Sequence, residues 1–119
     1  MSDTFSEVER VHHASDQFVS VGPGSLYINA ALWKTHMTGV EAVSYLVDQD
    51  AGRLAVVPAD PDADDTWPRS EPGGTRSGGQ FSCGQVLGQL GVTIESRDRV
   101  PFEYDESAER LVLDLSEYQ

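Results

Sequence analysis

Short runs of alternating apolar and polar residues, separated by glycine, proline or acidic turns, recur along the chain and predict β-strands. The first two runs are residues 17–21 and 25–28, and the Gly-Pro-Gly segment at residues 22–24 is typical of a tight turn between them. Asn29 then predicts a helix over residues 30–37, because its side-chain oxygen can accept hydrogen bonds from the free amides of the first helical turn.

The apolar runs that follow belong to a pattern that occurs twice. Residues 47–56 and residues 104–113, which lie 57 positions later, have Asp, Ala, Arg and Leu at the same places. Each copy predicts a strand, a polar turn and a return strand, and each comes after a predicted strand and helix. A unit of ~40 residues is too small to bury a core alone, so we expect the two copies to close around one shared core.

The second copy is predicted to begin with a strand at residues 80–82, where Ser82 caps a helix that ends at Leu90. Further strands are expected at residues 92–94, 100–104 and 110–115, with Arg97, Asp98 and Arg99 in an extra loop. Between the copies, a stretch rich in proline, glycine and acids has the composition of a linker.

One folded domain is the limit for a chain of 119 residues. Its expected segments are a flexible N-terminal arm (1–16), a first repeat (17–58), an acidic Pro/Gly-rich linker (59–79) and a second repeat (80–119). The predicted fold class is α+β, mainly β, a small pseudo-symmetric barrel built from two strand-helix-hairpin repeats.

The charge balance is strongly acidic. The chain has 20 Asp or Glu residues and 8 basic residues, and Lys34 is its one lysine beside seven arginines. Many hydrated carboxylates with few long lysine stems suit a protein that stays soluble in molar salt, where charges are screened to within ~3 Å. We therefore expect a halophilic protein that molar salt stabilises; an ordinary acidic protein and an acidic mimic of nucleic acid are the alternatives.

Several classes of protein are not expected. No segment approaches the ~20 apolar residues of a membrane span, and no secretory signal pattern is present, so we expect a cytoplasmic protein. The single cysteine, Cys83, cannot form an internal disulfide, and as a nucleophile it would need a base. Phosphate-binding, hydrolase and redox motifs are absent from the sequence, so neither an enzyme nor a cofactor is expected.

Two groups of residues have types that can bind metals. One has part of the spacing of a calcium-binding loop: Asp60, Asp62, Asp64 and Glu71. Asp65 stands where that loop needs glycine, so a solvated acidic loop is the simpler interpretation. The other group consists of the histidines: His12, His13 and His36. Two of these lie in the expected arm, and no metal site is predicted.

The order of strand, glycine turn, strand, short helix and hairpin resembles the swapped-hairpin fold of AbrB-like regulators and antitoxins. The resemblance rests on residues 19–22, residues 26–32 and the end of the first hairpin at residues 52–58. It implies that two units interlace into one barrel, here within a single chain, and that loop arginines bind DNA. The chain has Ser25 and Asn29 where family members typically have a basic residue and a proline.

The resemblance implies a small transcriptional regulator, and four basic residues are the candidate phosphate contacts: Lys34, Arg76, Arg97 and Arg99. The alternative is a protein-interaction module that uses its acidic surface and Trp67 to bind a toxin, a transcription factor or a second copy of the chain. Trp67 stands alone in the acidic stretch, where it can either fold back onto the domain or anchor a partner. Trp33, on an apolar helix face, is expected in the core.

Overall fold

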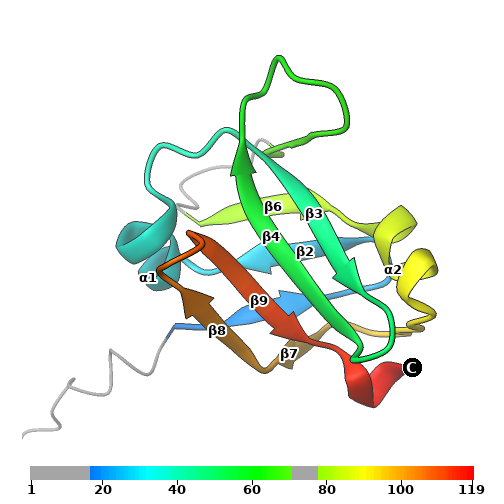
Figure 1. The fold of residues 1–119 in the computed structure, drawn as a ribbon. Coiled ribbons are helices and arrows are strands. Elements are labelled where there is room, and N and C mark those ends of the chain that lie inside the picture. The colour runs from blue at the N-terminus through cyan, green and yellow to red at the C-terminus, as the bar shows by residue number, and fades with distance from the viewer. Residues whose placement is uncertain (1–16, 71–77) are drawn as a thin grey trace, which may run out of the picture.

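The computed structural model describes residues 17–70 and 78–119. They form a mainly-β α+β domain of two antiparallel sheets and two short helices (Figure 1). The four-stranded sheet has the order β6-β2-β1-β7 and the five-stranded sheet the order β5-β3-β4-β9-β8. In chain order the strands are β1 Val19–Val21, β2 Ser25–Ile28, β3 Ala42–Asp48, β4 Arg53–Ala59, β5 Trp67–Pro68, β6 Gly79–Ser82, β7 Asp98–Val100, β8 Phe102–Asp105 and β9 Arg110–Asp114.

The first helix differs from the prediction in its second half. It begins as α1 (Ala30–Leu32) and continues as a π-helical turn, η2 (Trp33–Met37), where a single α-helix was expected. The Asn29 cap is confirmed, because its Oδ1 accepts from the Leu32 backbone N–H at 3.2 Å. The same oxygen accepts from the Phe18 N–H at 3.0 Å, so this cap also ties the helix start to the beginning of β1.

The second helix, α2 (Gly84–Leu90), is placed as predicted, but its expected cap is wrong. Ser82 belongs to β6, where it pairs with Ser25, and the N-cap position is Cys83, which makes no side-chain capping bond. At the other end Gly91 takes φ +73° and its N–H bonds back to the helix carbonyls, which ends the helix.

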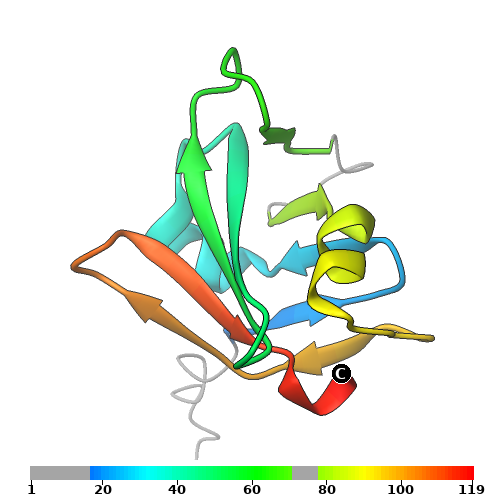
Figure 2. The same cartoon turned by 45° about the vertical axis from the view of Figure 1, so that its right-hand side comes forward.

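Both predicted hairpins are present and lie side by side in the five-stranded sheet (Figure 2). The first consists of β3 and β4, the second of β8 and β9, and β4 pairs with β9 between them. In that central pair Leu54 lies opposite Leu113 and Val56 opposite Leu111. All four side chains are buried, so the apolar alternation of each hairpin faces the core.

Three other segments depart from the sequence-based expectation. Residues 92–94 form no strand, although Val92 and Ile94 are buried. The expected Arg-Asp-Arg loop lies partly in β7, which starts at Asp98 and pairs with β1. The stretch expected to be only a linker contains β5, which pairs with the start of β3. The expected N-terminal arm, residues 1–16, lies outside the described residues.

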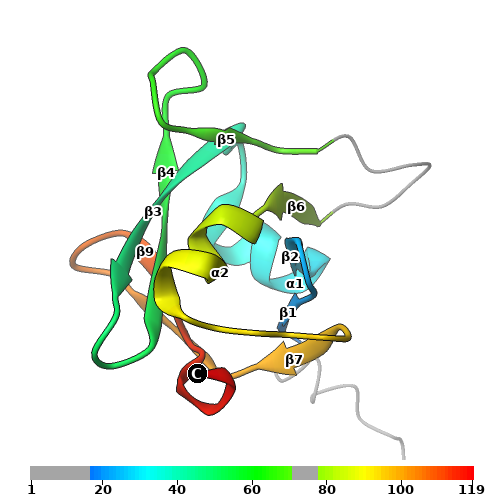
Figure 3. The same cartoon turned by 90° about the vertical axis from the view of Figure 1, so that its right-hand side faces the viewer.

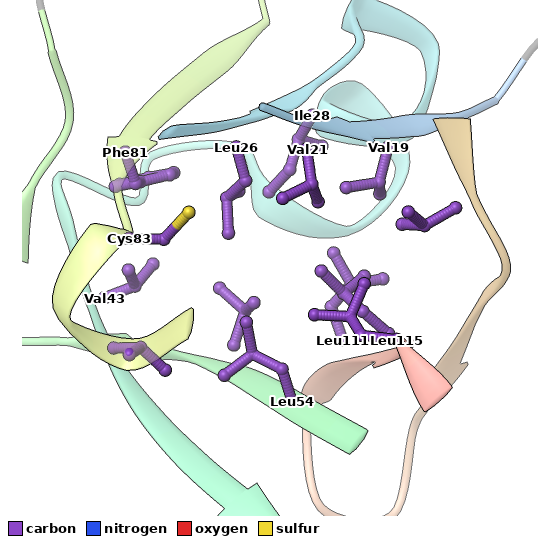
Figure 4. Packing of buried hydrophobic residues seen from close by; sticks show 14 of the residues in the cluster. Val19, Val21, Leu26, Ile28, Val43, Leu54, Phe81, Cys83, Leu111 and Leu115 are labelled. Carbon is purple, nitrogen blue, oxygen red and sulfur yellow. The ribbon is translucent and has the colours of Figure 1, made fainter. Parts of the chain in front are cut away.

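The core lies between the two sheets. Side chains from β1 and β2 face those from β4 and β9 across it (Figure 4). The two helices lie at opposite openings between the sheets, α1 on one side and α2 on the other (Figures 1 and 3). Trp33 is in this core, as predicted, at 6% exposure. Over residues 17–70 and 78–119 the sheets do not close into a continuous barrel.

Candidate nucleic-acid interface

The outer side of the four-stranded sheet carries a row of polar and basic residues. Gln80 pairs with Tyr27, Tyr27 with Ser20, and Ser20 with Arg99, so one row crosses all four strands. The neighbouring strand residues, such as Val19 and Val21, are fully buried in the core, so the row faces outward. We call this side, together with the adjacent Phe18 and Arg97, the arginine face.

Carboxylates are missing from the outward strand positions of this face. These positions are Ser20, Ser25, Tyr27, Gln80, Ser82 and Arg99. In a protein with a formal net charge of −12, a sheet face with arginines and no outward strand carboxylate is a local reversal of charge.

Arg97 is tied to the turn between β1 and β2. Its Nη1 donates to the Ser20 carbonyl (3.2 Å) and hydroxyl (2.9 Å), and its Nη2 donates to the Ser25 carbonyl (3.3 Å) and hydroxyl (2.6 Å). The guanidinium therefore bridges the two strands at the turn. A Cβ on Gly22 would lie 3.1 Å from Arg97 Nη2, which shows how closely the side chain covers the turn. This role engages donors that a phosphate would otherwise take.

Arg99 lies on the aromatic part of the same face. Its guanidinium carbon is 3.8 Å from the centroid of the Phe18 ring, a cation–π geometry. Phe18 in turn meets Tyr27 with ring centroids 6.2 Å apart and planes tilted by 57°. With Ser20 and Arg97, the pair of Phe18 and Arg99 lines an open hollow of about 470 Å³. A planar cation on an aromatic ring beside hydroxyl groups is suited to contact phosphate or a base.

The one carboxylate at this hollow is Asp98, and its two oxygens are both engaged. Oδ1 accepts from the Arg99 backbone N–H at 2.9 Å, and Oδ2 accepts from the Tyr118 hydroxyl at 2.8 Å. The latter bond is the main reason that the pKa of Tyr118 is raised. Asp98 is thereby held toward the C-terminal turn, η3 (Ser116–Tyr118), and its negative charge partly offsets the two arginines.

The structure brings two of the four predicted phosphate contacts together. Arg97 and Arg99 line the same hollow. Lys34 is exposed on η2 and is not among the residues of that hollow, and Arg76 lies outside the described residues. Phe18 and the serines of the turn were not predicted. The period-two spacing of the two arginines, read as a strand, would have placed both on one face.

Trp67 folds back onto the domain. It pairs with Val43, and its ring lies 4.8 Å from that of Tyr45, centroid to centroid, on the edge of the core. Of the two alternatives for this side chain, the packed one describes the structure. A partner could reach only the part that stays exposed.

The described residues that were considered for metals are not grouped into a site. Among residues 17–70 and 78–119 no three His, Cys, Asp or Glu side chains are grouped so as to hold a metal ion. His36 stacks on Tyr104 at 3.8 Å between ring centroids, whereas His12, His13 and Glu71 lie outside the described residues. Asp60 instead stabilises its own turn by accepting from the Asp62 N–H at 2.9 Å.

Cys83 is a buried core residue at the start of α2. Burial raises the pKa of its thiol to about 11, so the nucleophilic thiolate is scarce at neutral pH. Nearby Tyr45 donates its hydroxyl to the Ser82 carbonyl at 2.8 Å, and burial raises the pKa of Tyr45 as well. The Tyr45 hydroxyl bond holds the end of β6 to β3.

No described helix is long and apolar enough to cross a membrane. Comparison with known proteins gives no match to any family model, curated protein or solved structure.

Proposed function

We propose that this protein is a small non-enzymatic DNA-binding regulator of AbrB-like type, adapted to a salt-rich cytoplasm, and that it binds DNA through the arginine face. One observation carries the proposal. Arg97 and Arg99 lie side by side on a sheet face that has no outward strand carboxylates, in a chain of net charge −12. Acidic residues elsewhere would face away from the DNA and keep the protein soluble.

The arrangement of the hairpins supports the AbrB-like part of the proposal. Ala55 of β4 lies opposite Val112 of β9, and these residues are 57 positions apart, the same offset that relates the two repeated strings. The flanking pairs, Leu54 with Leu113 and Val56 with Leu111, exchange places under the same offset. A twofold axis through the central pair would produce this register, as expected if two equivalent units interlock.

The neighbours of each hairpin support a swapped arrangement. Strand β3 of the first repeat packs against α2 of the second, and Tyr104 of the second hairpin stacks on His36 of the first helix. The Ser70 N–H also donates to the Gln80 carbonyl at 2.8 Å, joining the end of β5 to β6. We infer that the two sheets are the halves of a swapped-hairpin fold made by one chain, in which the sheets face each other without closing into a barrel over the described residues.

Binding to duplex DNA of mixed sequence tests the function. Fluorescence anisotropy would be titrated over a series of KCl concentrations at which the protein is folded. Because each neutralised phosphate adds about 0.9 to the logarithmic salt slope, the double variant Arg97→Ala/Arg99→Ala should weaken binding and reduce that slope by about two. Arg99→Ala alone should reduce it by about one.

Two controls separate charge from position and shape. Gln89→Glu on the exposed side of α2 changes the net charge by the same amount as one arginine deletion, and it should leave the slope unchanged. Arg97→Ala alone removes both the charge and the four bonds to Ser20 and Ser25, so a loss of stability without a loss of slope would assign Arg97 to the turn alone. If the wild type does not bind at the lowest salt at which it remains folded, the DNA proposal fails.

A protein-interaction module is the second candidate function. It is favoured by Leu46 and Val47, which are the large apolar residues left exposed among those described, at 52% and 40%. Both lie in β3 of the five-stranded sheet, away from the arginine face. Leu46 pairs with Ala55 on the outer side of this sheet, where it could contact a partner.

A further inference from the structure

An apolar row crosses the outer side of the five-stranded sheet. Leu46 pairs with Ala55 and Ala55 with Val112, so the apolar row runs from β3 to β9, and the charged Glu103 lies next to it on β8. These positions alternate with the buried residues of β4 and β9 and therefore face outward. No helix of the described residues covers this side of the sheet (Figures 1 and 3).

A small groove lies along this row, next to a protruding side chain. The groove has a volume of about 170 Å³ and is lined by Ala55 and Val112 between two arginines, Arg53 and Arg110. Leu46 borders it and is 52% exposed, whereas Ala55 is 7% exposed. The short alanine side chain leaves the hollow, and the leucine beside it projects. The same face thus holds both a cavity and a side chain able to fill one.

Charges of both signs alternate around the groove. Arg53 lies across the strands from Asp48 on one side and from Asp114 on the other. Arg110 lies opposite Asp105, with Nε 3.6 Å from the carboxylate oxygen. The outward charges here are two arginines and four carboxylates, Asp48, Glu103, Asp105 and Asp114, so both signs are present with an acidic excess. A uniformly basic or uniformly acidic partner would meet like charges here, whereas a face with the same alternation can pair each arginine with a carboxylate.

We propose that the outer side of the five-stranded sheet is the interface of a symmetric dimer, in which a second copy of this chain is the occupant. Leu46 of each copy enters the groove over Ala55 and Val112 of the other. An isologous contact of this kind requires a surface that is complementary to itself, and this face provides the knob, the hole and both signs of charge. Outer faces of two sheets can pack in this way at about 10 Å.

Salt should control the association. Two copies with a formal charge of −12 each repel one another in dilute salt. Molar salt shortens the screening length to about 3 Å and removes most of that repulsion, while it leaves the burial of Leu46 intact. The dimer is therefore expected at molar KCl and should weaken as salt is lowered, the opposite of the salt dependence expected for DNA binding.

Sedimentation velocity of the full chain at molar KCl, over a range of protein concentrations, tests the proposal. The wild type should reach twice the chain mass of 13.0 kDa. Leu46→Glu would place a charge in the groove and should raise the dimer dissociation constant at least about tenfold. Gln89→Glu, which adds the same charge on exposed α2, should dimerise like the wild type. Leu46→Ala, a milder change, should weaken the dimer in the same direction.

Each outcome is decisive. A wild type that remains monomeric at every concentration in molar KCl overturns the proposal, whether or not the face binds some other protein. A dimer that Leu46→Glu and Leu46→Ala leave unchanged also overturns it, because the contact would then lie elsewhere. The result is independent of DNA binding, since Leu46 is on the opposite sheet from the arginine face.

Discussion

The two hairpins carry the same sequence pattern and form the same turn, yet they lie in different surroundings. Asp48 Oδ1 accepts from the Ala51 N–H at 3.2 Å, and Asp105 Oδ1 accepts from the Ala108 N–H at 3.3 Å. The residue after this alanine is in the left-handed region in both hairpins: Gly52 at φ +69° and Glu109 at φ +53°. The local pattern of Asp and Ala therefore sets the turn whether or not glycine is present.

The surroundings explain why only one of these turns has glycine. The Gly52 carbonyl accepts from the Leu115 N–H at 2.8 Å, and a Cβ on Gly52 would lie 2.7 Å from the Ser116 Cα. The C-terminal turn thus packs directly on the first hairpin. At the second hairpin the corresponding residue, Glu109, is exposed and projects a long side chain. Glycine is required by a tertiary contact in one copy, whereas the other copy tolerates strain.

The largest expected effect tests whether both hairpins belong to one core. Leu54 and Leu111 occupy the same place in the two copies and are 0% and 1% exposed. Replacing either with alanine should lower the free energy of unfolding by about 2–5 kcal/mol, because a buried leucine is lost and a cavity remains. Denaturant unfolding in molar KCl measures this, and both variants should unfold in one transition.

Leu46→Ala is the matched control for this pair, measured in dilute protein so that self-association does not contribute. Since Leu46 is 52% exposed, its replacement should cost less than about 1 kcal/mol. If Leu111→Ala costs as little as this control, the second hairpin contributes little to the common core, and the equivalence of the two hairpins is contradicted.

The second expected effect concerns the turn of the first hairpin. Gly52→Ala should lower the free energy of unfolding by about 2–4 kcal/mol, because a left-handed backbone is unfavourable for alanine and the Cβ would overlap the Ser116 backbone. Glu109→Ala, at the same place in the second hairpin, should change it by less than about 0.5 kcal/mol, since it exchanges one side chain for another. Equal costs at both sites would show that the C-terminal turn does not press on Gly52.

The same contrast between local and tertiary causes decides what the sequence could predict. Both hairpins and the Asn29 cap depend on neighbouring residues, and the sequence predicted them. Strand β5 has two residues in an acidic, proline-rich stretch, and it is a strand only because β3 lies beside it. The segment of Val92 and Ile94 is apolar like a strand, but it packs in the core without strand pairing.

The arginine face was predictable only in part, for the same reason. Arg97 and Arg99 lie two positions apart in the sequence, and this density of positive charge identified them as candidate phosphate contacts. The bonds from Arg97 to Ser20 and Ser25 span more than 70 residues, and the contact of Arg99 with Phe18 depends on the pairing of β7 with β1. Such contacts follow from the order of strands in the sheet, which hydrophobic periodicity does not specify.

The smallest expected effect is a gain of stability in the second hairpin. Glu109→Gly should raise the free energy of unfolding by about 0.5–1 kcal/mol, because glycine adopts the left-handed backbone at φ +53° without strain. Part of the gain is offset because glycine makes the unfolded chain more flexible. Removing the carboxylate could also stabilise an acidic protein, so Glu109→Gln is needed as a control that keeps the backbone strain. In molar KCl, where charges are screened, Glu109→Gln should match the wild type while Glu109→Gly is more stable. Equal gains in the two variants would assign the effect to charge, and the turn of the second hairpin would then be as relaxed as that of the first.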